Sequence, residues 1–109
     1  MTVKQLSERP EFETIVMPEP ERSIDGVYVG DLLSWVMGRA KADDAWITIM
    51  SNVNVVAVAS LSDVACVILA EGVNLDDEVA RTAEERGINV LKTSLPSFEA
   101  CRTFFGEVK

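Results

Sequence analysis

The stretch AWITIMSNVNVVAVASLSDVACVILAEG, residues 45–72, decides the fold class. Residues 45–50 and 64–70 are short and apolar on both faces, which is typical of strands covered on two sides. Residues 53–61 also resemble a strand by local propensity, but two consecutive parallel strands need a crossover of about a dozen residues, usually a helix. Asn52 or Asn54 suits the N-terminal cap of such a helix. We therefore predict a helix over 53–61 between two buried parallel strands.

The residues after this unit continue the alternation of helix and strand. A helix is predicted over 76–86, because Asp76 or Asp77 stands at its start and Gly87 just past its end. Residues 88–91 are predicted to form a third parallel strand. Pro96 opens a last helix, because proline suits the first helical turn. Its spacing of apolar residues predicts packing through Phe98, Cys101, Phe104 and Phe105.

The residues before the unit predict two helices and one strand. Thr2 suits the cap of a short helix over 3–9, and residues 12–16 alternate as a half-buried strand does. The run GVYVGDLLSWVMGRA, residues 26–40, turns at Gly30 and Asp31 into an amphipathic helix, with Asp31 as its cap. The expected buried face of this helix consists of Leu32, Leu33, Val36, Met37 and Ala40.

This alternating order predicts an α/β fold: a mainly parallel four-stranded sheet flanked by helices on both faces. The chain has 109 residues, of which 48% are apolar and 26% charged, so residues 1–109 are expected to form a single globular domain. No apolar run reaches the length of a membrane span, and the N-terminus lacks the features of a secretory signal. The expected location is the cytoplasm.

Composition narrows the classes of function. The net charge of −8 argues against binding to nucleic acids or anionic membranes, because each phosphate contact needs a lysine or arginine. The two cysteines, Cys66 and Cys101, stand in apolar positions and are expected to be buried thiols in a reducing compartment. Histidine is absent, which removes the commonest general base and the commonest metal ligand.

No catalytic or cofactor-binding motif is present. The phosphate-binding loop of nucleotide kinases, the dinucleotide fingerprint, the nucleophile elbow and the paired-cysteine motif are all missing. Carboxylates that suit a hard metal occur, but their spacing matches no calcium loop and each stands where a cap or turn favours an acid; they are Asp31, Asp43, Asp44, Asp63, Asp76 and Asp77. We predict no catalytic residue, no metal site and no cofactor.

A binding site for a small ligand is predicted at the carboxyl ends of the parallel strands, where ligands bind in folds of this type. The residues expected there are small and polar, with backbone amides at helix starts; they are Ser51, Asn52, Glu71, Gly72, Thr93 and Ser94. Such a strand-end rim suits a small polar or anionic ligand. Capping of the following helices is the alternative explanation for Ser51, Asn52, Thr93 and Ser94.

The two tryptophans are expected to differ in role. Trp46 stands on a central strand and is expected in the core. Trp35 and Arg39 fall toward the edge of the helical stripe over 32–40, where an aromatic residue and an arginine suit a protein interface. Burial in the core is the alternative for Trp35.

Three pieces of the sequence resemble the DRTGG domain family over nearly the whole chain. They are YVGDLLS before a helix, a strand ending in ILAEG, and the late run TSLPSFEA. The residues that give the family its name align with 23–27, where Gly26 alone is retained; Gly30 and Asp31 belong to the first of the three pieces. The chain is also similar to the non-catalytic N-terminal domain of HPr kinase/phosphorylase and to the DRTGG segment of phosphotransacetylases.

The resemblance implies an α/β module that dimerises and accompanies enzymes. The first hypothesis is a non-enzymatic regulatory or interaction module, a homodimer that senses a small anionic metabolite or nucleotide at the strand-end rim. The second is a structural accessory subunit that docks to a hydrogenase or NADH-oxidising redox complex, the setting that the resemblance implies for stand-alone members. The third is a magnesium-dependent enzyme acting on a phosphorylated substrate.

Overall fold

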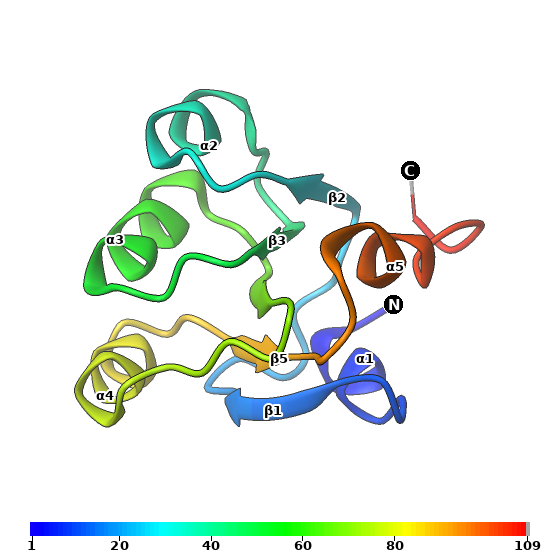
Figure 1. The fold of residues 1–109 in the computed structure, drawn as a ribbon, viewed down its shortest axis with the longest axis horizontal. Helices are drawn as coiled ribbons and strands as arrows, with labels where there is room; N and C mark the ends of the chain where they lie inside the picture. Colours follow the sequence, from blue (N-terminus) through cyan, green and yellow to red (C-terminus); the bar gives the residue numbers. More distant parts are fainter. Residues whose placement is uncertain (109) are drawn as a thin grey trace.

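The computed structural model describes residues 1–108 as a sheet between two layers of helices (Figure 1). Helices and strands alternate through most of the chain, as the sequence predicts. The helices are α1 (Val3–Ser7), α2 (Leu33–Arg39), α3 (Val53–Ser62), α4 (Asp77–Glu85) and α5 (Ser97–Arg102). The strands are β1 (Glu13–Val16), β2 (Gly26–Val29), β3 (Asp44–Thr48), β4 (Cys66–Leu69) and β5 (Val90–Lys92).

The sheet has five strands, in the order β1-β5-β4-β3-β2. The pairs from β2 to β5 are parallel, and β1 runs antiparallel to β5 at one edge. The prediction of a mainly parallel sheet is confirmed, but the expected count of four strands is wrong. The additional strand is β2, whose residues the sequence analysis assigns to the segment that leads into a helix. It has four residues and lies at the other edge, so it lacks the doubly apolar pattern of β3 and β4.

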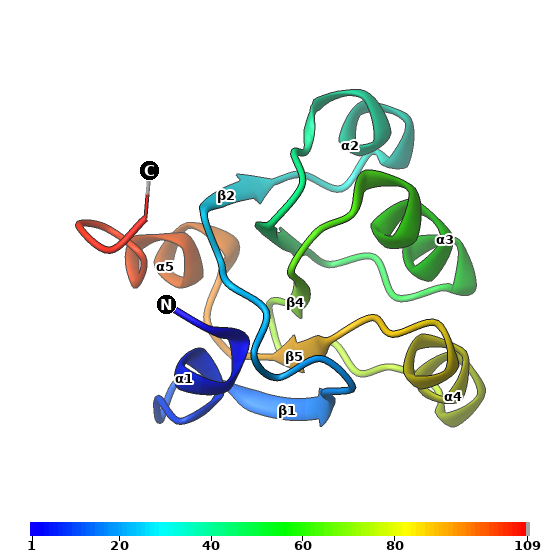
Figure 2. The same ribbon diagram turned by 180° about the vertical axis from the view of Figure 1, so that it is seen from behind.

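Side chains alternate between two apolar layers along the central strands, as the pleat of a sheet requires. On β3, Ala45 and Ile47 belong to the layer under α1 and α5, while Trp46 belongs to the layer under α2, α3 and α4. The two views show the helices divided in this way (Figures 1 and 2). Both faces of β3 and β4 are buried for this reason.

The helix predicted over 53–61 is confirmed as α3, which is the crossover between β3 and β4. Its cap is Asn52, whose side-chain oxygen accepts a hydrogen bond of 2.9 Å from the Asn54 amide. The helix ends at Asp63, which adopts a left-handed conformation with φ 57°. The valines of this segment favour a strand locally. Because β3 and β4 lie side by side and parallel, however, the segment between them must cross from the end of one strand to the start of the other, and it does so as a helix.

Two predicted helical faces need correction. On α2, Val36 is buried and Leu33 and Ala40 are half-buried, but Leu32 and Met37 are exposed. On α5 and the turn after it, Ala100 and Phe104 are buried, whereas Phe98 and Phe105 are exposed. The α2 helix packs mainly against α3, and α5 packs against β3 and β2. Each helix therefore buries only the stripe that faces these neighbours.

A cluster of charged side chains joins the chain segments before β3 and β4. The Arg22 guanidinium contacts the Asp43 carboxylate at 3.0 Å and the Asp63 carboxylate at 2.8 Å. Both aspartates have positive φ, 68° and 57°, a conformation that costs free energy in residues other than glycine. Arg22 thus stabilises the two turns that lead into the central strands.

The thiol of Cys66 provides a test of core burial. Cys66 is fully buried on β4, and desolvation raises the pKa of its thiol from 9.0 to about 12, although Arg22 acts in the opposite direction. The unfolded chain therefore loses this proton first as the pH rises. The stability contributed by Cys66 is intact below about pH 9 and declines as the pH approaches 12.

We expect wild-type protein to lose about 1 kcal/mol more of its unfolding free energy between pH 8 and pH 10 than Cys66→Ala. The measurement is urea denaturation at each pH, and Cys101→Ala is the control because Cys101 is half-buried. Equal losses in wild type and Cys66→Ala would contradict the burial of the thiol.

None of the helices within residues 1–108 combines the length and the apolar character needed to cross a membrane.

Candidate functional site

The elbow at Gly30 and Asp31 leads into α2, but Asp31 does not have the capping role that was predicted for it. Leu32 occupies the cap position of α2 without a side-chain hydrogen bond, so Asp31 does not cap this helix. One Asp31 carboxylate oxygen instead accepts hydrogen bonds from the Thr48 hydroxyl at 2.8 Å and the Ile49 amide at 2.9 Å. Asp31 therefore ties the start of α2 to the carboxyl end of β3.

The Tyr28 ring packs closely against Gly30. A β-carbon at position 30 would lie 2.9 Å from Cε2 of Tyr28, so the ring would have to shift to accommodate any other residue. The Gly30 carbonyl also accepts a hydrogen bond of 2.9 Å from the Trp46 indole. Gly26 is buried at the first position of β2. These two glycines and Asp31 thus serve to position the elbow against β3.

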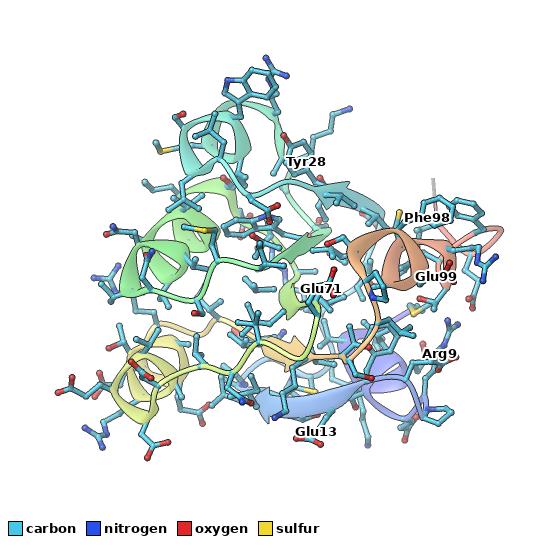
Figure 3. The ribbon with its side chains drawn as sticks, viewed as in Figure 1. Arg9, Glu13, Tyr28, Glu71, Phe98 and Glu99 are labelled. Carbon is cyan, nitrogen blue, oxygen red and sulfur yellow. The ribbon has the colours of Figure 1, made fainter. Side chains whose placement is uncertain are left out.

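The loops after β4 and β5 are joined by backbone hydrogen bonds. The Glu71 amide donates to the Leu95 carbonyl and the Gly72 amide to the Thr93 carbonyl, each at 2.9 Å. Glu71 and Gly72 are both left-handed, with φ 61° and 73°. Both amides are hydrogen-bonded within the protein, so the expectation that the amides at this point are free for a ligand is wrong. The Glu71 side chain is exposed near the middle of the strand-end face (Figure 3).

A groove of about 370 Å³ lies at the carboxyl end of β5, next to the edge strand β1. It brings together three of the six predicted rim residues, Gly72, Thr93 and Ser94. Glu71 adjoins it through the chain, whereas Ser51 and Asn52 follow β3 and do not line it. Asn52 caps α3, as the capping alternative predicts, and the buried Thr93 hydroxyl accepts a hydrogen bond of 3.2 Å from the Leu95 amide.

The groove also contains Lys92, which the sequence places at the end of the last parallel strand but which was not among the residues predicted to bind a ligand. The Lys92 ammonium group lies 2.6 Å from the Asn74 side-chain oxygen and 3.4 Å from the carboxylate of Glu13 on β1. The signal was its place as the last residue of a parallel strand, the usual position of ligand-binding groups. The remaining wall comes from the segment before and at the start of β1: Pro10, Glu11, Phe12 and Glu13.

The groove therefore carries charges of both signs. Lys92 contributes an ammonium group, and Glu11 and Glu13 contribute exposed carboxylates, that of Glu13 paired with Lys92 across the two strands. An ammonium group binds phosphate or carboxylate oxygens, and carboxylates accept hydrogen bonds from hydroxyl or amino groups. Such a lining suits a ligand that has both an anionic group and hydrogen-bond donors, rather than a bare anion.

The predicted interface residues Trp35 and Arg39 lie outside this groove, on α2. The Trp35 side chain is 53% exposed, so the alternative prediction that it is buried in the core is wrong. The Arg39 guanidinium lies 3.7 Å from the centre of the indole ring, a cation–π arrangement. Trp46 is fully buried, as predicted. Of the aspartates considered as metal ligands, Asp43 and Asp63 both contact Arg22, but within residues 1–108 no three carboxylate or thiol side chains converge on a common point.

Comparisons with known proteins agree on the architecture. The family model of the DRTGG domain matches residues 18–104. A crystal structure of the CBS and DRTGG domains from the regulatory region of Clostridium perfringens pyrophosphatase, complexed with the activator diadenosine tetraphosphate, is similar with a TM-score of 0.69. The two sequences are 17% identical, and the likeness covers 93% of this chain and 44% of that one. The likeness shows a shared fold. No curated protein matches the chain.

Proposed function

Because the chain belongs to the DRTGG domain family, we propose that it is a non-enzymatic regulatory module that binds a nucleotide or similar phosphate-bearing metabolite. The proposed site is the groove of Gly72, Lys92, Thr93 and Ser94. The protein acts in this proposal as a cytoplasmic homodimer, with residues 1–109 as one domain.

One observation carries the proposal: the groove at the carboxyl end of β5 combines three of the six predicted rim residues with an ammonium group. The neighbouring segment offers the carboxylates of Glu11 and Glu13. A nucleotide has phosphate oxygens for Lys92 and hydroxyl or amino donors for the carboxylates. The similar pyrophosphatase structure adds support, since it is a regulatory region complexed with a nucleotide activator.

A thermal-shift screen against mononucleotides, diadenosine tetraphosphate, acyl phosphates and sugar phosphates tests this proposal. A ligand at ten times its dissociation constant stabilises the native state by about 1.4 kcal/mol, which raises the melting temperature by roughly 5–10 °C in a domain of this size. We expect one ligand class to give such a shift in wild type and Lys92→Ala to lose most of it.

The matched control is Lys41→Ala, which removes the same charge from an exposed position outside the groove. Lys92 is only partly buried, so its removal leaves the fold intact and the unliganded melting temperature nearly unchanged. A shift that survives Lys92→Ala unchanged would place the ligand elsewhere, and no shift with any ligand would overturn the proposed binding.

The second candidate is an accessory subunit that docks to a larger enzyme, and one observation favours it. Trp35 and Arg39 form an exposed stacked pair on α2, with Leu32 and Met37 exposed on the same helix. Aromatic and arginine side chains are enriched where proteins bind one another. A folded protein whose melting temperature rises with none of the ligands in the screen would favour this function. The third hypothesis, a magnesium-dependent enzyme, gains no supporting observation from the structure.

A further inference from the structure

The outer face of α3 is apolar although it lies at the surface. Within residues 53–62 the helix contains no charged residue, whereas a surface helix normally presents charged side chains to solvent. Its outward stripe has the spacing i, i+4, i+8 and consists of Val53, Ala57 and Leu61. Val53 is 51% exposed and Leu61 is 73% exposed, and Ala57 between them is half-buried. These three residues, which we name the α3 strip, leave about 12 Å of apolar surface uncovered.

The α3 strip lies at the centre of a layer of three helices. The helices α2, α3 and α4 lie side by side on one face of the sheet, with α3 in the middle (Figures 1 and 2). On α2, Arg39 lines a groove with residues of β2, so the flank that carries Arg39 and Trp35 is turned toward the β2 edge. Met37 lies about 200° around the helix from both, on the flank turned toward α3, and it is 49% exposed. Met37 therefore borders the α3 strip on its α2 side.

A groove borders the strip on its other side, between α3 and α4. It has a volume of about 420 Å³, and its apolar lining comes from one valine of each helix, Val53 and Val79. The polar side chains that line it all come from α4; they are Glu78, Arg81, Thr82 and Glu85. Glu78 and Glu85 are exposed and lie about two turns apart on one side of α4. The α4 margin of the groove therefore carries two carboxylates against one guanidinium.

We propose that the α3 strip and the groove beside it bind an amphipathic helix of a partner protein, whose margin toward α4 is basic. A groove between two packed helices has the shape that accepts a third helix, and apolar residues at helical spacing are the usual anchors of such a contact. The apolar face of the partner helix then covers Val53, Ala57 and Leu61. Its lysine or arginine side chains lie opposite Glu78 and Glu85.

Charge favours a different protein over a second copy of this chain. Copies with a net charge of −8 repel one another. A symmetric contact through this layer would also place the acidic margin of α4 against the same margin or against the uncharged α3. The negative charge likewise disfavours a nucleic acid or an anionic membrane as the occupant. A basic amphipathic helix satisfies both the apolar strip and the carboxylates.

The test uses four fluorescein-labelled helical peptides of about 18 residues, with binding measured by fluorescence anisotropy. Three share a stripe of leucines at helical spacing and have margins of lysine, glutamine or glutamate. The fourth has the composition of the lysine peptide in scrambled order. We expect the lysine peptide to bind at least about tenfold more tightly than the glutamate and scrambled peptides. Equal binding of the lysine and scrambled peptides, or no binding of any peptide, would overturn the inference.

Two variants with matched controls locate the contact. Leu61→Asp places a charge in the α3 strip and should weaken binding of the lysine peptide by about tenfold or more. Phe105→Asp places the same charge at a residue that is 65% exposed and lies after α5, and it should leave binding unchanged. Both side chains are exposed, so both variants fold. An equal loss in the two variants, or no loss in Leu61→Asp, would contradict docking on α3.

The second pair of variants tests the acidic margin. Glu78→Lys combined with Glu85→Lys should reverse the preference, so that the glutamate peptide binds more tightly than the lysine peptide. Asp77→Lys combined with Glu84→Lys changes the net charge equally at exposed positions of α4 outside the groove, and it should not reverse the preference. The same reversal in both double variants would contradict a margin formed by Glu78 and Glu85.

Light scattering distinguishes a separate partner from a second copy. A wild-type dimer that becomes a monomer in Leu61→Asp would assign this layer to a second copy and overturn the partner helix. The inference goes beyond the proposed ligand site and does not depend on it. Lys92→Ala should still bind the lysine peptide, and Leu61→Asp should keep any rise in melting temperature that a ligand causes, so loss of either binding event leaves the other intact.

Discussion

Replacement of Trp46 by alanine is expected to lower the free energy of unfolding by about 3–5 kcal/mol, the cost of emptying a large buried aromatic site. Trp46 lies between Tyr28 and Val67 on the sheet, fully buried beneath the layer of α2, α3 and α4. The substitution also leaves the Gly30 carbonyl without its donor at 2.9 Å. The elbow before α2 should therefore loosen together with the core.

Urea denaturation followed by circular dichroism measures this loss, and the second tryptophan supplies the control. Trp35→Ala removes the same residue type from an exposed position and should cost less than about 1 kcal/mol. Trp46→Phe keeps most of the ring volume but removes the indole donor, so it should cost about 1–3 kcal/mol. Similar losses for Trp35→Ala and Trp46→Ala would contradict the central place of Trp46.

Replacement of Asn89 by alanine is expected to cost about 2–4 kcal/mol, although Asn89 lies far from any candidate site. Its side chain is 1% exposed, and the residue lies immediately before β5. The amide nitrogen donates to the carbonyls of Glu19 and Ala65 at 2.8 and 2.9 Å, and the amide oxygen accepts from the Glu19 backbone at 2.8 Å. Asn89 thus holds the loop after β1 to the sheet as a neighbouring strand would.

The loss from Asn89→Ala is larger than that of one hydrogen bond because three backbone groups lose a bond, although the Glu19 carbonyl keeps the one from the Arg22 amide at 3.3 Å. Water reaches the groups of Glu19 in part, since this residue is exposed, which keeps the cost below the sum for fully buried groups. Asn89→Asp is a sharper variant, because it retains the shape but replaces the two donated bonds with a buried carboxyl group that faces two carbonyl oxygens. Asn54→Ala, on the exposed side of α3, should change stability by less than about 0.5 kcal/mol. A cost for Asn89→Ala as small as that of Asn54→Ala would contradict the described contacts.

The missed strand β2 and the wrong buried face of α5 share a physical cause at the β2 edge. A strand with neighbours on both sides and helices on both faces shows a continuous apolar run, as β3 and β4 do. An edge strand is half-exposed, so the four residues of β2 gave a weak pattern. The same edge explains α5, where helical spacing predicted burial of Phe98 and Phe105. Spacing identifies an apolar face, but it does not say whether the same chain supplies the surface that covers it.

The candidate site was predicted only in part for a related reason. The order of elements predicts which residues stand at the carboxyl ends of the parallel strands. Gly72, Thr93 and Ser94 were placed correctly at one end of the sheet for this reason. Their meeting with Pro10 and Glu13 depends on β1, which pairs antiparallel with β5 across most of the chain length. Local pattern contains no information on such a pairing. Asp31 shows the same limit, because its acceptor role joins it to Thr48 rather than to its own helix.

The sequence by itself determined the α/β class, the crossover helix α3 and the two doubly buried strands, because these follow from short-range periodicity and from the geometry of parallel pairing. The tertiary structure alone decided which strand occupies each edge, which side chains wall the groove beside Lys92, and which apolar faces remain uncovered. Those outcomes depend on contacts between residues far apart in the chain. Their energies come from burial and hydrogen bonds that form only when the whole sheet has assembled.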